Sequence, residues 1–164
     1  IVEGILTYFQ RIYMVSDGWH IRVAEIENNK VSSIILRHPE PRETAPLEVL
    51  NSRSSGYSKV LKQSQSPIFV FEDLEKAVAK KEYKQYGSES IKDRSLILYK
   101  VIHPDTNECL LIISIKGPER TKLEQKLTKD YRSSLELFSD RLLLEYATLK
   151  AIHMLKGKYE QKNN

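Results

Sequence analysis

The chain has few of the residues that cross-link a protein or interrupt its regular elements. Its 164 residues include one cysteine, six glycines and six prolines. One cysteine cannot form an internal disulfide, and so few glycines and prolines favour regular elements joined by short loops. The longest apolar run without a charge, residues 109–115, is far below the ~20 residues that span a bilayer. With no secretory signal pattern either, we expect a cytoplasmic protein that does not contact membranes.

The chain also has only a small excess of positive over negative charge. The chain has 26 Lys and Arg against 22 Asp and Glu, a net charge of +4. The whole excess lies in residues 116–164, which hold 11 basic and 7 acidic side chains. A dedicated nucleic-acid-binding domain carries a stronger basic stripe. We therefore expect no direct contact with nucleic acid.

The hydrophobic pattern of the first part predicts a helix and then a hairpin. Residues 1–15 have the helical spacing of apolar side chains. Strands are predicted over residues 19–26 and 31–36, with Trp19 on the same face as the next apolar positions. Asn28 and Asn29 between the strands predict a two-residue turn, because Asn tolerates a positive φ.

The middle of the chain predicts helices around a short buried strand. Residues 46–63 have a helical pattern with a break over the Ser-rich stretch 51–56. Residues 68–71 are apolar and predict a strand. Asp73 predicts the N-cap of the next helix, and Gly87 predicts its C-terminal stop.

The last part predicts a second hairpin followed by C-terminal helices. The strands are residues 95–102 and 108–115, with a Pro-, Asp- and Asn-rich turn between them. Thr121 with Glu124 fits a capping box at the start of a helix, and Ser139 fits the cap of a second helical segment.

This order of elements predicts an α+β fold. We expect a five- to six-stranded antiparallel sheet flanked by N- and C-terminal helices. The whole of residues 1–164 forms one domain in this interpretation. It consists of an N-terminal helix over 1–15, the sheet and covering helices over 16–117, and C-terminal helices over 118–160.

The residues typical of catalysis are scattered. No phosphate-binding loop, dinucleotide fingerprint, zinc-protease motif or nucleophile elbow is present. The four histidines are far apart in sequence, and none has a second ligand three or four residues away; they are His20, His38, His103 and His153. Cys109 lies in an apolar strand, where a thiol usually behaves as a small hydrophobic group. We expect no catalytic residue, no metal and no cofactor, and so no enzyme.

Aromatic residues give the more informative pattern, since a sheet and a covering helix that both contribute rings can enclose a ligand. Arg94, just before a strand, is suited to pair with an anionic group. The predicted lining of a cavity of at least ~300 Å³ is Phe69, Phe71, Tyr83, Tyr86, Arg94 and Tyr99. The alternatives are that the rings form a plain core and that Arg94 faces solvent.

Several segments together resemble the GAF family of small-molecule sensor domains. Residues 94–102 match the family's Arg-Ser-hydrophobic strand, and residues 109–114 match the apolar strand that follows a hairpin. Residues 66–73 are similar to its middle strand, and residues 138–144 resemble the start of its terminal helix. Glu108 departs from the glycine that is common there. The cyclic-nucleotide signature and the bilin-attachment cysteine of some family members are absent.

The resemblance implies a regulatory sensor domain of a larger signalling or transcription-regulating protein, which binds a small-molecule effector. The alternative is a protein–protein or dimerisation module of PAS-like or profilin-like shape without a ligand. A repeat of seven residues in the terminal helix, at Leu142, Leu149 and Lys156, adds a second expectation. We expect a homodimer through residues 1–15 and 142–154. In the alternative interpretation this stripe packs on the domain's own sheet.

Overall fold

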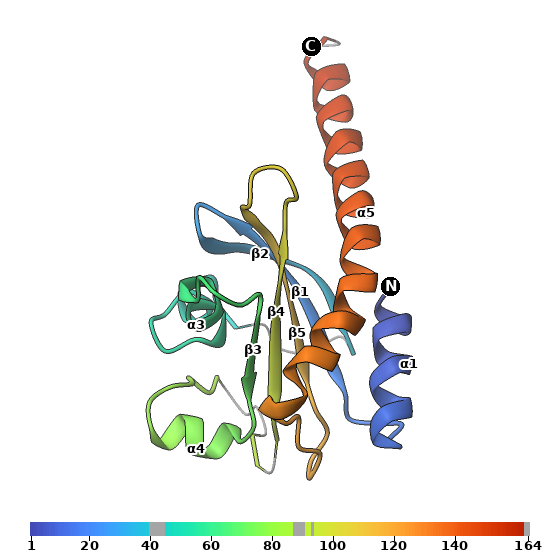
Figure 1. Ribbon diagram of the computed structural model, residues 1–164. Coiled ribbons are helices and arrows are strands. Elements are labelled where there is room, and N and C mark those ends of the chain that lie inside the picture. The colour runs from blue at the N-terminus through green and yellow to red at the C-terminus, as the bar shows by residue number, and fades with distance from the viewer. Residues whose placement is uncertain (40–44, 87–90, 93, 163–164) are drawn as a thin grey trace.

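One antiparallel sheet organises the molecule. The computed structural model describes residues 1–39, 45–86, 91–92 and 94–162. Within these residues five strands form a sheet with helices on both faces (Figure 1), which confirms the predicted α+β class. From one edge to the other the strands are β2 (Lys30–His38), β1 (His20–Glu27), β5 (Cys109–Lys116), β4 (Leu96–Ile102) and β3 (Ile68–Phe71).

Both predicted hairpins are confirmed. Asn28 and Asn29 join β1 to β2 with φ values of 51° and 59°, as a tight turn with two left-handed residues requires. The β4–β5 turn closes where the amide of His103 donates to the carbonyl of Glu108 at 2.8 Å. Asn107 there also has a positive φ, 59°. In both turns, asparagine adopts the backbone conformation that other side chains disfavour.

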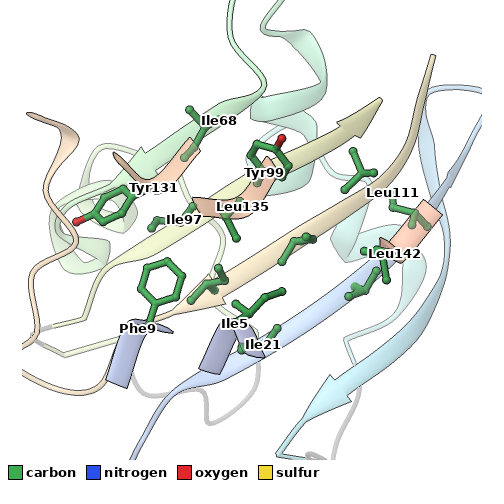
Figure 2. Packing of buried hydrophobic residues seen from close by; sticks show 14 of the residues in the cluster. Ile5, Phe9, Ile21, Ile68, Ile97, Tyr99, Leu111, Tyr131, Leu135 and Leu142 are labelled. Carbon is green, nitrogen blue, oxygen red and sulfur yellow. The ribbon is translucent and has the colours of Figure 1, made fainter. Parts of the chain in front are cut away.

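The first face of the sheet is covered by the two terminal helices. The predicted N-terminal helix is α1 (Val2–Tyr13), and the C-terminal helix is α5 (Thr128–Lys162). Ile5 and Phe9 of α1 are fully buried against the sheet, and Leu135 of α5 packs beside them. Figure 2 shows these side chains interdigitating over the strands. Trp19, Ile21 and Val23 belong to this core, as predicted.

The opposite face is covered by three short helices, α2 (Leu47–Leu50), α3 (Gly56–Lys62) and α4 (Leu74–Ala79). The predicted break between the first two is confirmed, and Ser55 caps α3 by accepting the amide of Ser58 at 3.0 Å. Asp73 caps α4 as predicted, since its carboxylate accepts the amide of Lys76 at 2.9 Å. This hydrogen bond lowers the pKa of Asp73.

The helix after Asp73 is shorter than predicted. It ends at Ala79, because Lys81 adopts a φ of 59° and the amide of Glu82 returns to the carbonyl of Ala77 at 2.7 Å. Such a left-handed residue stops a helix with or without a glycine. The predicted stop at Gly87 lies outside the described residues.

The predicted caps of the C-terminal helices are wrong. Thr121 lies in irregular chain, where its carbonyl accepts the hydroxyl of Ser95 at 2.8 Å. A short 3₁₀ turn, η1 (Gln125–Leu127), then leads into α5. This helix continues through Ser139, whose hydroxyl donates to the carbonyl of Glu136 at 2.8 Å instead of capping a new segment.

Helix α5 is much longer than the part of it that packs on the sheet. Its 35 residues span roughly 50 Å at ~1.5 Å per residue, and Figure 1 shows its C-terminal part extending beyond the sheet. Leu142 and Tyr146 still pack against the core of their own domain. From residue 147 to residue 155 every side chain is exposed. We call residues 147–155 the exposed α5 extension.

Candidate functional site

The sheet face beneath the short helices changes from apolar to polar along strands β1 and β5. Side chains alternate between the two faces of a strand, so the even-numbered residues of β1 and β5 lie on this face. Ala24, Ile26 and Ile112 are apolar and form part of its hydrophobic core. Toward the other end of the same strands, four polar side chains replace them: His20, Arg22, Ser114 and Lys116. A covered sheet face that becomes polar toward one end is a place to look for a site, because ligand sites combine apolar walls with a few polar groups.

Strand register brings these four side chains together. His20 lies opposite Lys116 in the β1–β5 ladder, and Arg22 lies opposite Ser114. Directly opposed residues have Cβ atoms ~4.5–5.5 Å apart. Lys116 and Ser114 are only 7% and 8% exposed.

These side chains form the floor of a cavity of about 50 Å³ that is more enclosed than the other hollows described below. Its wall and roof come from the residues before α2, from α2 and α3, and from the segment that follows α4. We call it the basic pocket. It is lined by His20, Arg22, Ala45, Val49, Leu50, Ser55, Gly56, Tyr57, Tyr83, Lys84, Tyr86, Leu96, Leu98, Ser114 and Lys116.

The lining of the basic pocket has one sign of charge. Arg22, Lys84 and Lys116 are cationic, and none of the described residues that line the pocket is acidic. Hydroxyl groups of serine and tyrosine supply further hydrogen-bond donors, while leucine and valine side chains close the walls. The pocket therefore combines apolar walls with a few polar groups, as ligand sites do. At about 50 Å³ it is smaller than the ~300 Å³ expected of a drug-sized site.

The predicted aromatic lining divides between this pocket and its surroundings. Tyr83 and Tyr86 line the basic pocket. Phe71 contacts Tyr83 with ring centroids 5.7 Å apart, and Phe69 contacts Phe71 at 4.7 Å. The two phenylalanines line a neighbouring hollow along the edge strand β3 instead. They therefore support the wall around Tyr83 without lining the basic pocket.

Arg94 and Tyr99 lie elsewhere. Arg94 directs its guanidinium to the carbonyl of Gly18 at 3.5 Å. Tyr99 belongs to the core under α1 and α5, on the opposite face of the sheet (Figure 2), where burial raises the pKa of its hydroxyl. Its register partner is Ile68, whereas Phe69 pairs with Leu98. The six predicted residues thus do not surround one cavity. Tyr99 in particular points to the other face of the sheet.

Seven polar lining residues were not predicted: His20, Arg22, Ser55, Tyr57, Lys84, Ser114 and Lys116. In the sequence, polar residues alternating with Ile21 and Ile115 are typical of a solvent-facing side of a strand. One signal was present in the sequence. Within each strand, the residues of this face change from apolar (Ala24 and Ile112) to polar (Arg22 and Ser114). Using it requires knowing that β1 and β5 are neighbours, which local patterns do not reveal.

Two larger hollows are more open to solvent and have mixed charge. One of about 470 Å³ beside β3 includes Asp73 and Lys76 among its lining residues. Another of about 910 Å³ near the hairpin tips includes Glu108 and Lys100. Acidic and basic side chains partly neutralise one another in both hollows. The basic pocket is therefore the better candidate for selective binding.

Groups that could react are poorly placed or inactive. Burial raises the pKa of the Cys109 thiol to about 11, so it is protonated at neutral pH and a weak nucleophile. In the part of the chain that the structure describes, no three His, Cys, Asp or Glu side chains gather as metal ligands. Within the same residues, no helix combines the length and apolar character needed to cross a membrane.

Comparisons with models of known families, with curated proteins and with solved structures give no significant match. The functional argument therefore rests on the chain's own residues and on the geometry of the basic pocket.

Proposed function

We propose that this chain is a non-catalytic regulatory sensor domain, of the GAF-like kind that its sequence resembles. It binds a small molecule in the basic pocket and transmits the binding through its terminal helices. In a larger protein it would control a signalling or transcription-regulating output.

The polar floor of the basic pocket is the observation that carries this proposal. Four polar side chains project from the two central strands, at places where the same sheet face is otherwise apolar. A structural role alone favours apolar residues at such covered positions. Polar side chains beside a cavity with apolar walls can orient a ligand bound there.

The chemistry of the lining favours binding over reaction. Among the described lining residues, the charged groups are a guanidinium and two ammonium groups, which donate hydrogen bonds. General acid–base catalysis commonly uses carboxylates or a histidine oriented by one. The described lining includes no carboxylate and no thiol.

Strand alternation gives a route from the basic pocket to the terminal helices. Ile21 lies between His20 and Arg22 in sequence, and Ile115 lies between Ser114 and Lys116. Both isoleucines are fully buried in the core that packs under α1 and α5. Because protein cores are densely packed, a shift of the pocket floor displaces the side chains on which the helices rest.

A second copy of the chain is the proposed partner of the helices. Within the exposed α5 extension, four large apolar side chains contact solvent: Leu149, Ile152, Met154 and Leu155. Helix α1 adds an exposed Ile12. Apolar residues gathered on one protruding helix are typical of a contact surface. Leu142, which was predicted to contribute to this interface, is instead buried in its own domain.

Ligand binding is tested first by thermal unfolding with a panel of nucleotides, amino acids, short carboxylates and inorganic anions. A ligand at 100 times its Kd adds ~2.7 kcal/mol to the free energy of unfolding. We expect at least one compound to raise Tm by several degrees. Ala45→Leu, which adds volume at the pocket wall, should abolish that shift.

Ala79→Leu is the matched control, since it makes the same change on the exposed surface of α4, outside the pocket lining. It should leave the ligand-induced Tm shift unchanged. If no compound stabilises the protein, or if Ala45→Leu retains the full shift, the sensor proposal is wrong.

A ligand-free dimerisation module is the second candidate. The exposed α5 extension favours it, because that surface would function without any occupant of the pocket. The two candidates differ in the thermal experiment above. A dimer that no compound of the panel stabilises supports the dimerisation module.

A further inference from the structure

We infer that two copies of the chain pair through the exposed α5 extension as a parallel, in-register, two-stranded coiled coil. The seam of this coiled coil consists of Thr148, Ile152 and Leu155, on the side of α5 that faces away from its own sheet. The inference rests on the proposed function, which names a second copy as the partner. It adds the contact face and the orientation of the two helices.

Two side chains show which side of α5 is already occupied where the extension begins. The hydroxyl of Tyr146 donates to the carboxylate of Glu25 in β1 at 2.6 Å. Lys150, about one helical turn further along, pairs with the same carboxylate at 2.5 Å and with Glu27 at 3.4 Å. This side of the helix therefore faces the chain's own sheet.

The opposite side of the extension carries the seam residues. Successive residues of a helix are turned by ~100°, so the residues two before, two after and five after Lys150 lie roughly opposite to it. These are Thr148, Ile152 and Leu155, and all three are exposed. Ile152 and Leu155 remain 43% and 57% exposed. Two large aliphatic side chains thus face solvent where α5 extends beyond the sheet (Figure 1).

The spacing of the seam residues is that of a coiled coil. Thr148, Ile152 and Leu155 follow one another at intervals of four and three residues, which are positions d, a and d of a seven-residue repeat. Isoleucine at a with leucine at d favours two parallel strands. The seam is therefore suited to one further helix of the same direction.

The residues beside the seam make this surface complementary to itself. In a parallel pair, position g of one helix flanks position e of the other. Leu144 occupies g and Leu149 occupies e, and they are 69% and 55% exposed. Pairing with an identical copy would cover these leucines and bring no like charges together there. Self-complementarity of this kind is what a two-fold dimer requires.

Glu145 sets the start of the seam. It occupies the preceding a position and pairs with Arg141 of the same helix at 3.1 Å. Two carboxylates do not suit the dry interior of a coiled coil. The two helices therefore separate toward their own sheets on the N-terminal side of Thr148.

Disulfide cross-linking in the full chain tests the seam. Cys109→Ala removes the free thiol of β5, and either Thr148→Cys or Leu155→Cys then adds a thiol at a d position. In a parallel, in-register pair each d residue lies beside its own counterpart, within the ~4.4–6.8 Å between Cα atoms that a disulfide spans. We expect mild oxidation to convert most of each variant to a species of twice the mass on a non-reducing gel.

His153→Cys in the same background is the matched control. Residue 153 is exposed and belongs to the same helical turn, but it lies outside the seam. This variant should remain mostly uncross-linked under the same oxidation. Sedimentation velocity of the reduced proteins records whether they are dimers.

The outcomes separate this inference from the proposed function. Cross-linking of Thr148→Cys and of Leu155→Cys, but not of His153→Cys, supports the seam. Cross-linking of only one d variant indicates antiparallel or shifted helices, and equal cross-linking of all three indicates random collision; each overturns the inference. A dimer in which no variant cross-links overturns the seam but keeps the proposed homodimer. A monomer overturns both, whereas the thermal-unfolding panel decides ligand binding independently.

Discussion

Single side chains decide which part of the sheet is a core and which part is a site. Ala24 and Ile112 fill the covered face at one end of the central strands, whereas Arg22 and Ser114 occupy the next positions on that face. One step along each strand in that direction therefore changes apolar packing into a hydrogen-bonding surface. The proposed function therefore depends on two residues per strand more than on the fold around them.

The sheet face to which each residue points also explains what the sequence could and could not predict about the site. Tyr83 and Tyr86 line the basic pocket, although they follow α4 instead of lying within the predicted helix that extends to residue 86. Tyr99 was misplaced because the register between β3 and β4 puts it beside Ile68. A shift of one residue moves a side chain to the other face, and the sequence alone does not fix that register.

Glu25 holds α5 on the sheet through a buried carboxylate. It accepts hydrogen bonds from Tyr146 at 2.6 Å and Ser33 at 2.9 Å, and Lys150 pairs with it at 2.5 Å. Burial alone would raise the pKa of Glu25, but these partners lower it to about 2. The ionised form is thus more stable in the folded protein than in the unfolded chain.

We therefore predict a pH-dependent cost for Glu25→Gln. At pH 7 the variant should lose about 1–2 kcal/mol of unfolding free energy, less than the ~3 kcal/mol of the full pKa shift. The expected loss is smaller than the full pKa shift implies because Lys150 is 46% exposed and solvent screens its charge. The difference between variant and wild type should shrink as pH falls from about 4.5 toward 2, where Glu25 becomes protonated.

Urea unfolding at pH 7, 4 and 3 measures this difference. Glu108→Gln, in the exposed β4–β5 turn, is the control and should cost little at any of these pH values. A cost for Glu25→Gln that does not change between pH 7 and pH 3 would show that the ionised carboxylate contributes nothing.

At the scale of helices and strands, short sequence patterns correctly predicted the turns and helix starts that depend on neighbouring residues. The β1–β2 turn follows from two asparagines that tolerate a positive φ, and α4 begins where Asp73 supplies a cap. The end of α4 was mispredicted because Lys81 adopts a left-handed conformation without being a glycine. Ser139 resembled a cap, yet packing keeps α5 continuous through it. In α5, tertiary contacts overrode the local preference for a cap.

The exposed α5 extension is the element from which we predict a partner. Most helical stability in proteins comes from packing of an apolar face, and this segment leaves Leu149 55% exposed. A second surface that covers these apolar side chains would stabilise the extension. A parallel copy of α5, with α1 beside it, would supply one.

We predict a homodimer that buries at least ~1,000 Å² in total, the usual minimum for a specific contact. Leu149→Asp places a charge in that contact and should give a folded monomer in sedimentation velocity. Ile35→Asp, a similar change at an exposed position of the edge strand β2, should remain dimeric. Wild-type protein that sediments as a monomer at high concentration contradicts the predicted interface.

At the scale of the whole molecule, one sheet connects two different surfaces. The short helices enclose the basic pocket on one face, while the terminal helices pack on the other (Figure 1). Ile21 and Ile115 occupy the strand positions between the polar floor residues and contact the terminal-helix core. Occupancy of the pocket and the position of α1 and α5 are therefore expected to be linked, and linkage of this kind is reciprocal.

The most direct test of the central claim is an NMR titration of the ¹⁵N-labelled chain with the compounds of the thermal-unfolding panel at constant ionic strength. The account predicts saturable amide shifts for at least one compound, concentrated at residues 20–22 and 114–116, with smaller shifts in α1. Shifts confined to α5, or no saturable shift with any compound, would contradict the proposal that the basic pocket is the site of a sensor domain.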